Sequence, residues 1–144
     1  MSTEQNIELV KNFFAALGSR DAGDLLALAA EDIEWIVPGE GWPLAGTHRG
    51  HAGLAAVLEK ASEEVETHYP KPPEFVAQGN RVMVVGIATG KIKATQKTFK
   101  DEWVFDITLR DGKVAHIHEY IDTQALARAA QIDAITPPGS TFRT

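Results

Sequence analysis

The sequence FKDEWVFDITLRDGKVAHIHEYID spans residues 99–122 and decides the fold. Asp111-Gly112 near its centre suits a type I′ turn, in which both central residues need a positive φ. The segments on either side of this dipeptide are rich in β-branched and aromatic residues. The stretch therefore predicts an antiparallel hairpin whose two-residue turn sets Arg110 opposite Lys113.

Counting outward from that turn assigns the hairpin side chains to two faces, because opposed residues share a face of the sheet. Val104 is then expected opposite Glu119. One face would carry Glu102, Val104, Asp106, Thr108, Ala115, Ile117, Glu119 and Ile121. The other would carry Trp103, Phe105, Ile107, Leu109, Val114, His116, His118 and Tyr120. A β-bulge would break this parity partway along the strands.

The remaining elements are predicted from capping signals, periodicity and turn residues. Ser2 and Gln5 fit a capping box for a first helix, which ends at Gly18-Ser19, and Asp21 is suited to cap a second helix. The later elements are expected in this order: a strand at Ile33–Val37, a loop over 38–50 with a small strand at Ala45–His48, a helix over His51–Glu66, strands at Glu74–Gln78, Arg81–Ile92, Phe99–Arg110 and Lys113–Asp122, and a short helix from a Thr123 cap through Gln131.

Helices followed by a meander of antiparallel strands predict the α+β class. Long twisted strands curl, so helices laid on the concave side close a pocket. We therefore expect a cone-shaped, curved antiparallel sheet wrapped around the N-terminal helices and enclosing one pocket. A single domain is expected over residues 1–135, followed by an irregular, proline-containing tail over 136–144.

The composition excludes several classes of function. The 144 residues carry a net charge of −6 and no cysteine, which argues against nucleic-acid binding and excludes disulfides and thiolate chemistry. We find no signal peptide and no apolar run near the ~20 residues of a membrane span, so a cytoplasmic protein without membrane contact is expected. Gly-rich phosphate loops and zinc-binding H-E-x-x-H motifs are also missing from the sequence, and no cofactor is predicted.

Two groups of motifs resemble a known superfamily. The first comprises Trp35–Gly39 and Pro43–His51, and the second comprises Leu109–Val114 and Glu119–Thr123. Their order and spacing are similar to those of SnoaL-like proteins in the nuclear transport factor 2-like superfamily. The resemblance implies the ketosteroid isomerase-like, cystatin-like α+β roll, a pocket for an apolar or moderately polar small molecule, and a homodimer paired through the outer sheet face.

The resemblance also implies acid–base residues. Asp106 corresponds to the oxyanion-hole aspartate of ketosteroid isomerase, an acid that stays protonated so that it can donate a hydrogen bond. Glu119 corresponds to an acid of limonene epoxide hydrolase. Both side chains would then point into the pocket, whereas hydrophobicity alone makes the Trp103 face the core. The sequence leaves this conflict open.

Neither related catalytic set is complete in this chain. Val37 stands where ketosteroid isomerase has its proton-shuttling aspartate, and the first helix offers Phe13 or Phe14 in place of a tyrosine. Gly86 and Ala88 stand where the epoxide hydrolase has an arginine and an aspartate. We therefore predict neither ketosteroid isomerase activity nor epoxide hydrolase activity for this chain.

Histidines and aromatic residues complete the candidate site. His116 and His118 alternate on one strand, but a metal site needs a third ligand, so no metal is predicted and His118 is a candidate for ligand hydrogen bonding or proton transfer. The predicted ligand-binding residues are Trp35, Trp42, Trp103, Phe14 and Tyr120, and the loop position of Trp42 is typical of a lid or an interface anchor.

Two functions compete. The first is a cofactor-independent isomerase, cyclase, dehydratase or hydrolase in which Glu119, Asp106 and His118 transfer protons. The second is a non-catalytic ligand-binding or dimeric structural module, favoured by Val37 in place of a base.

Overall fold

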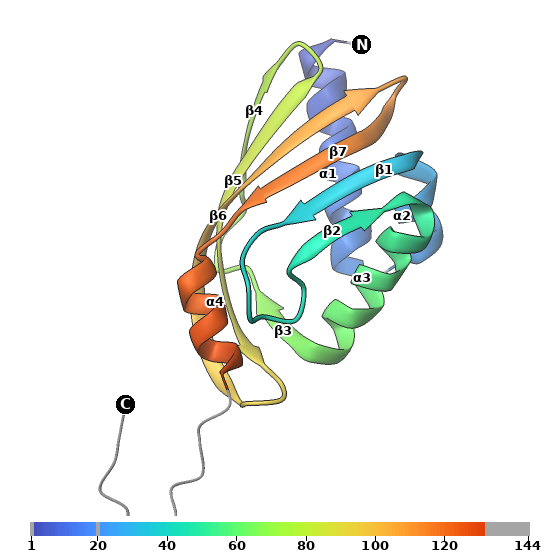
Figure 1. Ribbon diagram of the computed structural model, residues 1–144. Coiled ribbons are helices and arrows are strands. Elements are labelled where there is room, and N and C mark those ends of the chain that lie inside the picture. The colour runs from blue at the N-terminus through green and yellow to red at the C-terminus, as the bar shows by residue number, and fades with distance from the viewer. Residues whose placement is uncertain (1, 20, 132–144) are drawn as a thin grey trace, which may run out of the picture.

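A computed structural model of the chain describes residues 2–19 and 21–131. Seven strands form one strongly curled sheet, and the N-terminal helices lie against it (Figure 1). In chain order the elements are α1 (Thr3–Ser19), α2 (Ala22–Leu28), β1 (Ala29–Val37), β2 (Gly46–Arg49), α3 (Gly50–Glu64), β3 (Val65–His68), β4 (Glu74–Gln78), β5 (Arg81–Ile92), β6 (Lys97–Arg110), β7 (Lys113–Tyr120) and α4 (Thr123–Ala130). The predicted α+β class and cone shape are confirmed.

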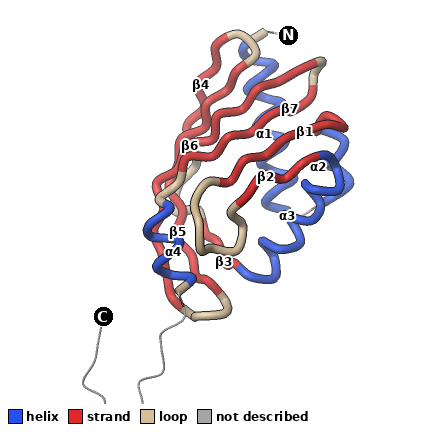
Figure 2. The backbone as a smooth tube through the Cα atoms, viewed as in Figure 1, coloured by secondary structure: helices blue, strands red, loops and turns tan. Residues whose placement is uncertain are grey.

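The sheet order is β2-β1-β7-β6-β5-β3, and β4 also pairs with β5. Figure 2 shows α1, α2 and α3 together on one side of the curled strands, while α4 lies at the opposite end of the sheet. A continuous core fills the space between the sheet and these first helices, and it includes Phe13, Leu54, Trp103 and Ile117. None of the described helices is long and apolar enough to cross a membrane.

Local signals near chain turns and helix starts predicted the structure accurately. The backbone N–H of Ser2 donates to Oε1 of Gln5 at 2.8 Å, and the N–H of Gln5 donates to Oγ of Ser2 at 3.1 Å, which confirms the capping box. Asp21 caps α2 by accepting from the N–H of Asp24. Asp111 and Gly112 have φ values of 53° and 73°, as the predicted turn requires.

Other expectations were wrong, chiefly where distant segments pair. The helix over His51–Glu66 ends at Glu64, because Val65–His68 pairs with β5 as an additional strand. The strands are not a purely antiparallel meander, since β1 runs parallel to β7. Asp122, not Thr123, caps α4, because its side chain accepts from the N–H of Ala125.

A β-bulge in β7 decides which residues face the concave side. Leu109 pairs with Val114 and Thr108 pairs with His116, so Ala115 is the extra residue. Beyond it the parity reverses, and Glu119 lies opposite Phe105 in place of the expected Val104. A bulge adds local twist, which a strongly curled sheet requires. The register counted from the turn is therefore correct at Arg110 and Lys113 and wrong from His116 onward.

The predicted domain limits extend past the described residues. The range 1–135 runs beyond residue 131, where the description ends, and the tail over 136–144 lies entirely outside it.

Candidate functional site

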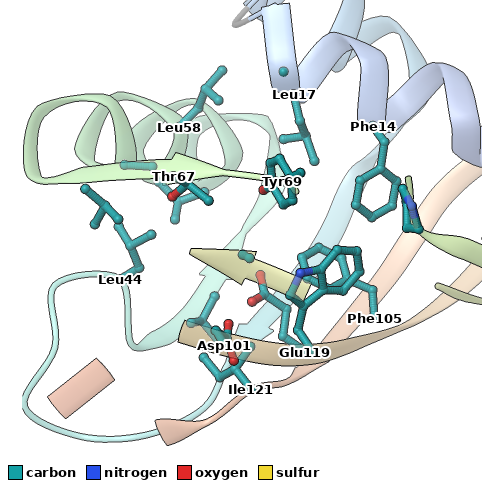
Figure 3. Close-up of a pocket in the computed structure, with 18 of the residues that line it drawn as sticks. Phe14, Leu17, Leu44, Leu58, Thr67, Tyr69, Asp101, Phe105, Glu119 and Ile121 are labelled. Carbon is teal, nitrogen blue, oxygen red and sulfur yellow. The ribbon is translucent and has the colours of Figure 1, made fainter. Parts of the chain in front are cut away.

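A cavity of about 620 Å³ lies between the concave face of the sheet and the helices. This volume is typical of sites that hold a small organic molecule. Its lining comes from most elements of the fold and is mainly apolar, with Phe14, Val57, Leu58, Phe99 and Ile121 among the contributors. Figure 3 shows Phe14 and Phe105 at one end of the cavity and Leu44 at the other.

Aromatic rings form a continuous wall of the cavity. The ring of Phe14 is stacked on Trp103, with centroids 6.0 Å apart and planes 12° apart. Phe105 contacts both rings at centroid distances of 5.2 and 5.0 Å. Such a wall offers flat, polarisable surface to the body of a ligand.

Gly86 allows the Trp103 indole to lie against β5. The two residues are paired across β5 and β6, and a Cβ at Gly86 would lie 2.4 Å from Cζ2 of Trp103. No real structure tolerates a contact that close. The Trp103 ring thus fills the space that a side chain at position 86 would take.

Glu119 is the buried carboxyl of the site. It lies on β7, is 8% exposed and lines the cavity. The reversed parity after Ala115 turns its side chain to the concave face, and there Nε1 of Trp35 donates a hydrogen bond to its Oε1 at 2.5 Å. Burial raises the pKa of Glu119 to about 8; the Trp35 hydrogen bond opposes this increase, and the negative charge of Asp101 adds to it. Glu119 therefore carries its proton at neutral pH.

The Trp35 contact also favours one of the two carboxyl oxygens as the site of that proton. An indole N–H can only donate, so Oε1 must act as an acceptor. The carbonyl oxygen is the stronger acceptor of a neutral carboxyl, which favours Oε1 as the carbonyl and Oε2 as the hydroxyl; the hydrogen bond found for the Glu119 side chain among the described residues is the one to Oε1. Because Glu119 lines the cavity, this O–H is chemically able to donate a hydrogen bond to a molecule bound there.

Asp101 is a second buried carboxyl, 6% exposed, on the same side of the cavity as Glu119 (Figure 3). Its Oδ1 accepts from the backbone N–H of Asp122 at 2.8 Å, which ties β6 to the start of α4. Burial raises the pKa of Asp101, the Asp122 N–H lowers it, and the charge of Asp122 raises it. Two carboxyls with different hydrogen-bond partners thus face one apolar cavity.

Tyr69 lies across the cavity from these acids, beside Thr67 (Figure 3). Its ring is edge-on to Trp103 at a centroid distance of 6.2 Å. Desolvation raises the pKa of Tyr69, and the charges of Glu119 and Asp101 raise it further. The tyrosine therefore remains a hydroxyl at neutral pH and is a second hydrogen-bond donor in the cavity lining.

Two of the three predicted proton-transfer residues lie outside the cavity. Asp106 pairs with His118 on the convex face and accepts from the Arg81 guanidinium, with Nη2 to Oδ2 at 2.5 Å. His118 stacks on Tyr120 with ring centroids 4.5 Å apart. The expectation that Asp106 points into the pocket is wrong, because the bulge at Ala115 places Glu119 and Asp106 on opposite faces.

The predicted aromatic residues divide in the same way. Phe14, Trp35, Trp42 and Trp103 line the cavity, and Tyr120 does not; it is 52% exposed on the convex face. Trp42 sits in the loop between β1 and β2, where its Nε1 donates to the carbonyl of Pro38 at 3.1 Å. Within the described ranges, no group of three or more His, Cys, Asp or Glu residues is arranged to hold a metal ion.

Sequence reasoning missed Asp101 and Tyr69. Asp101 lies on β6 two residues before Trp103, so it shares a face of the strand with Trp103 and Phe105. That alternation would have indicated Asp101 once the Trp103 face was known to be concave. Tyr69 follows the unpredicted strand β3 and precedes Pro70, and the sequence offered no signal for it.

Comparison with known proteins identifies close relatives of the chain. The SnoaL-like domain family matches residues 10–117. An NTF2-like protein from Burkholderia xenovorans, known from a crystal structure, is 67% identical; the match covers 91% of this chain and 99% of that one, with a TM-score of 0.88.

Two more distant relatives show the same fold or sequence pattern. TerC, crystallised with polyporic acid, is 29% identical, with 88% of this chain and 98% of that chain covered and a TM-score of 0.76. An uncharacterized protein from Mycobacterium tuberculosis is 23% identical over 120 residues, which is 83% of this chain and 91% of that protein.

Proposed function

Because this chain belongs to the SnoaL-like domain family, we propose that it is a small-molecule pocket protein that catalyses acid–base chemistry on an apolar ligand without a cofactor. The observation that carries the proposal is Glu119, a buried carboxyl that lines an apolar cavity and holds its proton at neutral pH. The solved relative crystallised with polyporic acid supports a small organic ligand.

The proton on Oε2 of Glu119 suits a ligand oxygen. A neutral carboxyl in an apolar site donates a hydrogen bond to a carbonyl oxygen and stabilises the negative charge that develops there when a neighbouring carbon loses a proton. Ketosteroid isomerase uses a protonated acid in this way. In this chain Glu119 has that chemical character, while Asp106 does not line the cavity and is paired with Arg81.

Asp101 supplies the complementary base. In its ionised form it takes the proton from the carbon next to the ligand carbonyl, while Glu119 hydrogen-bonds the carbonyl oxygen as the enolate forms. Return of that proton to a different carbon completes an isomerisation. Attack of the enolate carbon on an electrophilic carbon of the same ligand, with the proton passed to the new alkoxide, completes a ring closure.

Exchange of carbon-bound hydrogen tests this proposal without knowledge of the natural substrate. Aryl ketones such as tetralone are incubated with the protein in heavy water, and deuterium uptake beside the carbonyl is followed by NMR. We expect accelerated exchange, a loss of about tenfold or more in Glu119→Gln and Asp101→Asn, and no change in Asp106→Asn. Bound ketone without accelerated exchange would contradict the catalytic proposal.

A non-catalytic binding protein is the second candidate, and Val37 favours it. Val37 lines the cavity and is 3% exposed, so the wall at this point carries no base. Under this alternative, ketones bind the cavity and quench tryptophan fluorescence equally in the wild type and in Asp101→Asn, and neither protein accelerates exchange.

We also propose that the chain forms a homodimer through the convex face of the sheet. Val85, Val104 and Tyr120 are neighbours across β5, β6 and β7 on that face, and Val76 lies beside this row on β4, where it pairs with Met83. Val76, Val85 and Tyr120 are 61%, 42% and 52% exposed. A contiguous apolar row of this kind favours a covering partner. The cytoplasmic location stays a prediction from the sequence.

A further inference from the structure

The charged residues of the cavity are segregated by sign. Lys11 on α1 and Lys71 in the loop between β3 and β4 line the cavity and are exposed to solvent. The other charged residues among the described lining are Asp101 and Glu119, which are both buried. In a chain with 20 acidic and 14 basic residues, the exposed charges of the cavity lining are thus both positive. We call Lys11 and Lys71 the rim lysines.

Lys11 is held at the outer end of the aromatic wall. Its Nζ lies 5.5 Å from the ring centroid of Phe75, which is itself edge-on to Phe14 at 6.2 Å. Phe14 continues the row inward by stacking on Trp103. The ammonium group therefore stands where an apolar ligand body, lying along these rings, would emerge into solvent.

Lys71 lines the same cavity and is restrained by its neighbours in sequence. Pro70 precedes it and Pro72 and Pro73 follow it, and Tyr69, Pro72 and Pro73 also line the cavity. Proline fixes φ, so the segment keeps little backbone freedom. Neither rim lysine forms an ion pair with another residue in the described part of the chain, which leaves both charges available to a ligand.

We propose that the ligand is an amphiphilic organic anion whose apolar body fills the cavity and whose anionic group is bound by Lys11 and Lys71. The inference rests on the proposed function in one respect, namely that the cavity takes a small molecule. The inference also specifies the orientation of the ligand: when its anionic group is bound by the rim lysines, its opposite end contacts the Glu119 hydroxyl. The rim lysines also attract anions from solution to an otherwise acidic protein.

Two fluorescent probes that differ in one charge test the inference. Anilinonaphthalene sulfonate and phenylnaphthylamine share their ring systems, but only the first carries an anion. We expect the double variant Lys11→Gln/Lys71→Gln to bind the sulfonate probe about tenfold more weakly at low salt, on the order of threefold per lysine. Its affinity for the neutral probe should change less than about twofold. The double arginine variant should retain the wild-type affinity, and added salt should weaken the sulfonate probe only.

Two controls locate the binding. Lys100→Gln removes an exposed lysine of β6 that does not line the cavity, and it should change neither affinity. Ala61→Trp fills the cavity from α3 and should weaken both probes.

The outcomes separate this inference from the proposed function. If Ala61→Trp weakens both probes but the double glutamine variant changes neither, or changes both equally, the rim lysines do not select anions and the inference fails while the pocket function stands. If neither probe binds, or Ala61→Trp leaves both unaffected, the cavity takes no small molecule and both proposals fail.

Discussion

Nε1 of Trp35 donates a hydrogen bond to Oε1 of Glu119, and this contact joins β1 to β7 across 84 residues of sequence. It orients the acid on which the proposed chemistry depends, because it leaves the Oε2 hydroxyl to the cavity. Trp35 pairs with Ile117 of the parallel strand, and Glu119 follows Ile117 by two residues on the same face, so the side chains of Trp35 and Glu119 lie within reach of each other.

The free energy of unfolding should decline with rising pH because of Glu119. Its pKa is raised from an ordinary 4.5 to about 8 in the folded protein. Between these values the folded state holds a proton that the unfolded chain has released, so the contribution of Glu119 to stability is greatest below about pH 4.5 and falls until about pH 8. The decline from this group is at most about 1.4 kcal/mol per pH unit.

Glu119→Gln removes this titration. Denaturant unfolding at a series of pH values should show the variant gaining stability relative to the wild type as pH rises from about 5 to 8, whereas other titrating groups cancel in the difference. A difference that stays constant over this range would contradict a raised pKa.

Asp101→Asn should lower the pKa of Glu119, because the charge of Asp101 raises it. The asparagine keeps an oxygen acceptor for the N–H of Asp122, so α4 should remain folded. Asp101→Ala removes the acceptor as well and should cost a further ~1 kcal/mol or more of stability. Carboxyl NMR and denaturation of the two variants separate the charge from the hydrogen bond.

Gly86→Ala should distort the aromatic wall. Its Cβ would meet the Trp103 ring at 2.4 Å, so the indole must move, at a cost of about 1–3 kcal/mol. We expect weaker binding of the neutral probe and altered tryptophan fluorescence. Gly23→Ala, whose added Cβ meets only Oδ1 of Asp21 at 3.4 Å, is the matched control and should leave probe binding unchanged.

The convex face should mediate a dimer. Light scattering of the wild type should give twice the chain mass, and Val85→Lys should give the monomer, because it places a charge in the apolar row. Ala56→Lys introduces the same charge on the exposed side of α3 and should remain dimeric. A wild-type mass of one chain at all concentrations would refute the dimer.

Local chemistry in the sequence predicted most of the fold, as the Ser2–Gln5 capping box and the Asp111-Gly112 turn show. Pairings between distant segments were not predictable. The residues of β3 continue the helical pattern of α3, and only their pairing with β5 makes them a strand. The parallel pairing of β1 with β7 has no local signal in the sequence. The bulge at Ala115 was predictable in part: a strongly curled sheet requires a bulge, but nothing in the sequence indicates at which residue it occurs.

That single bulge also decided the candidate site. Glu119 was singled out by resemblance and the Trp103 face by hydrophobicity, and only the reversed parity reconciles the two. Asp106 was singled out by the same resemblance, but its partner Arg81 and its convex position give it no access to the cavity. The sequence indicated which residue types belong to the site, but the face of the sheet on which each lies depended on one extra residue, Ala115.

The most direct test of the account is the titration of Glu119, followed by carboxyl-carbon NMR on protein labelled at glutamate, with Glu119→Gln to assign the signal. We expect a carboxyl that is protonated at pH 7 and titrates near pH 8. A Glu119 signal that titrates between about pH 4 and 5, like an ordinary exposed glutamate, would contradict the neutral acid on which the proposed function rests.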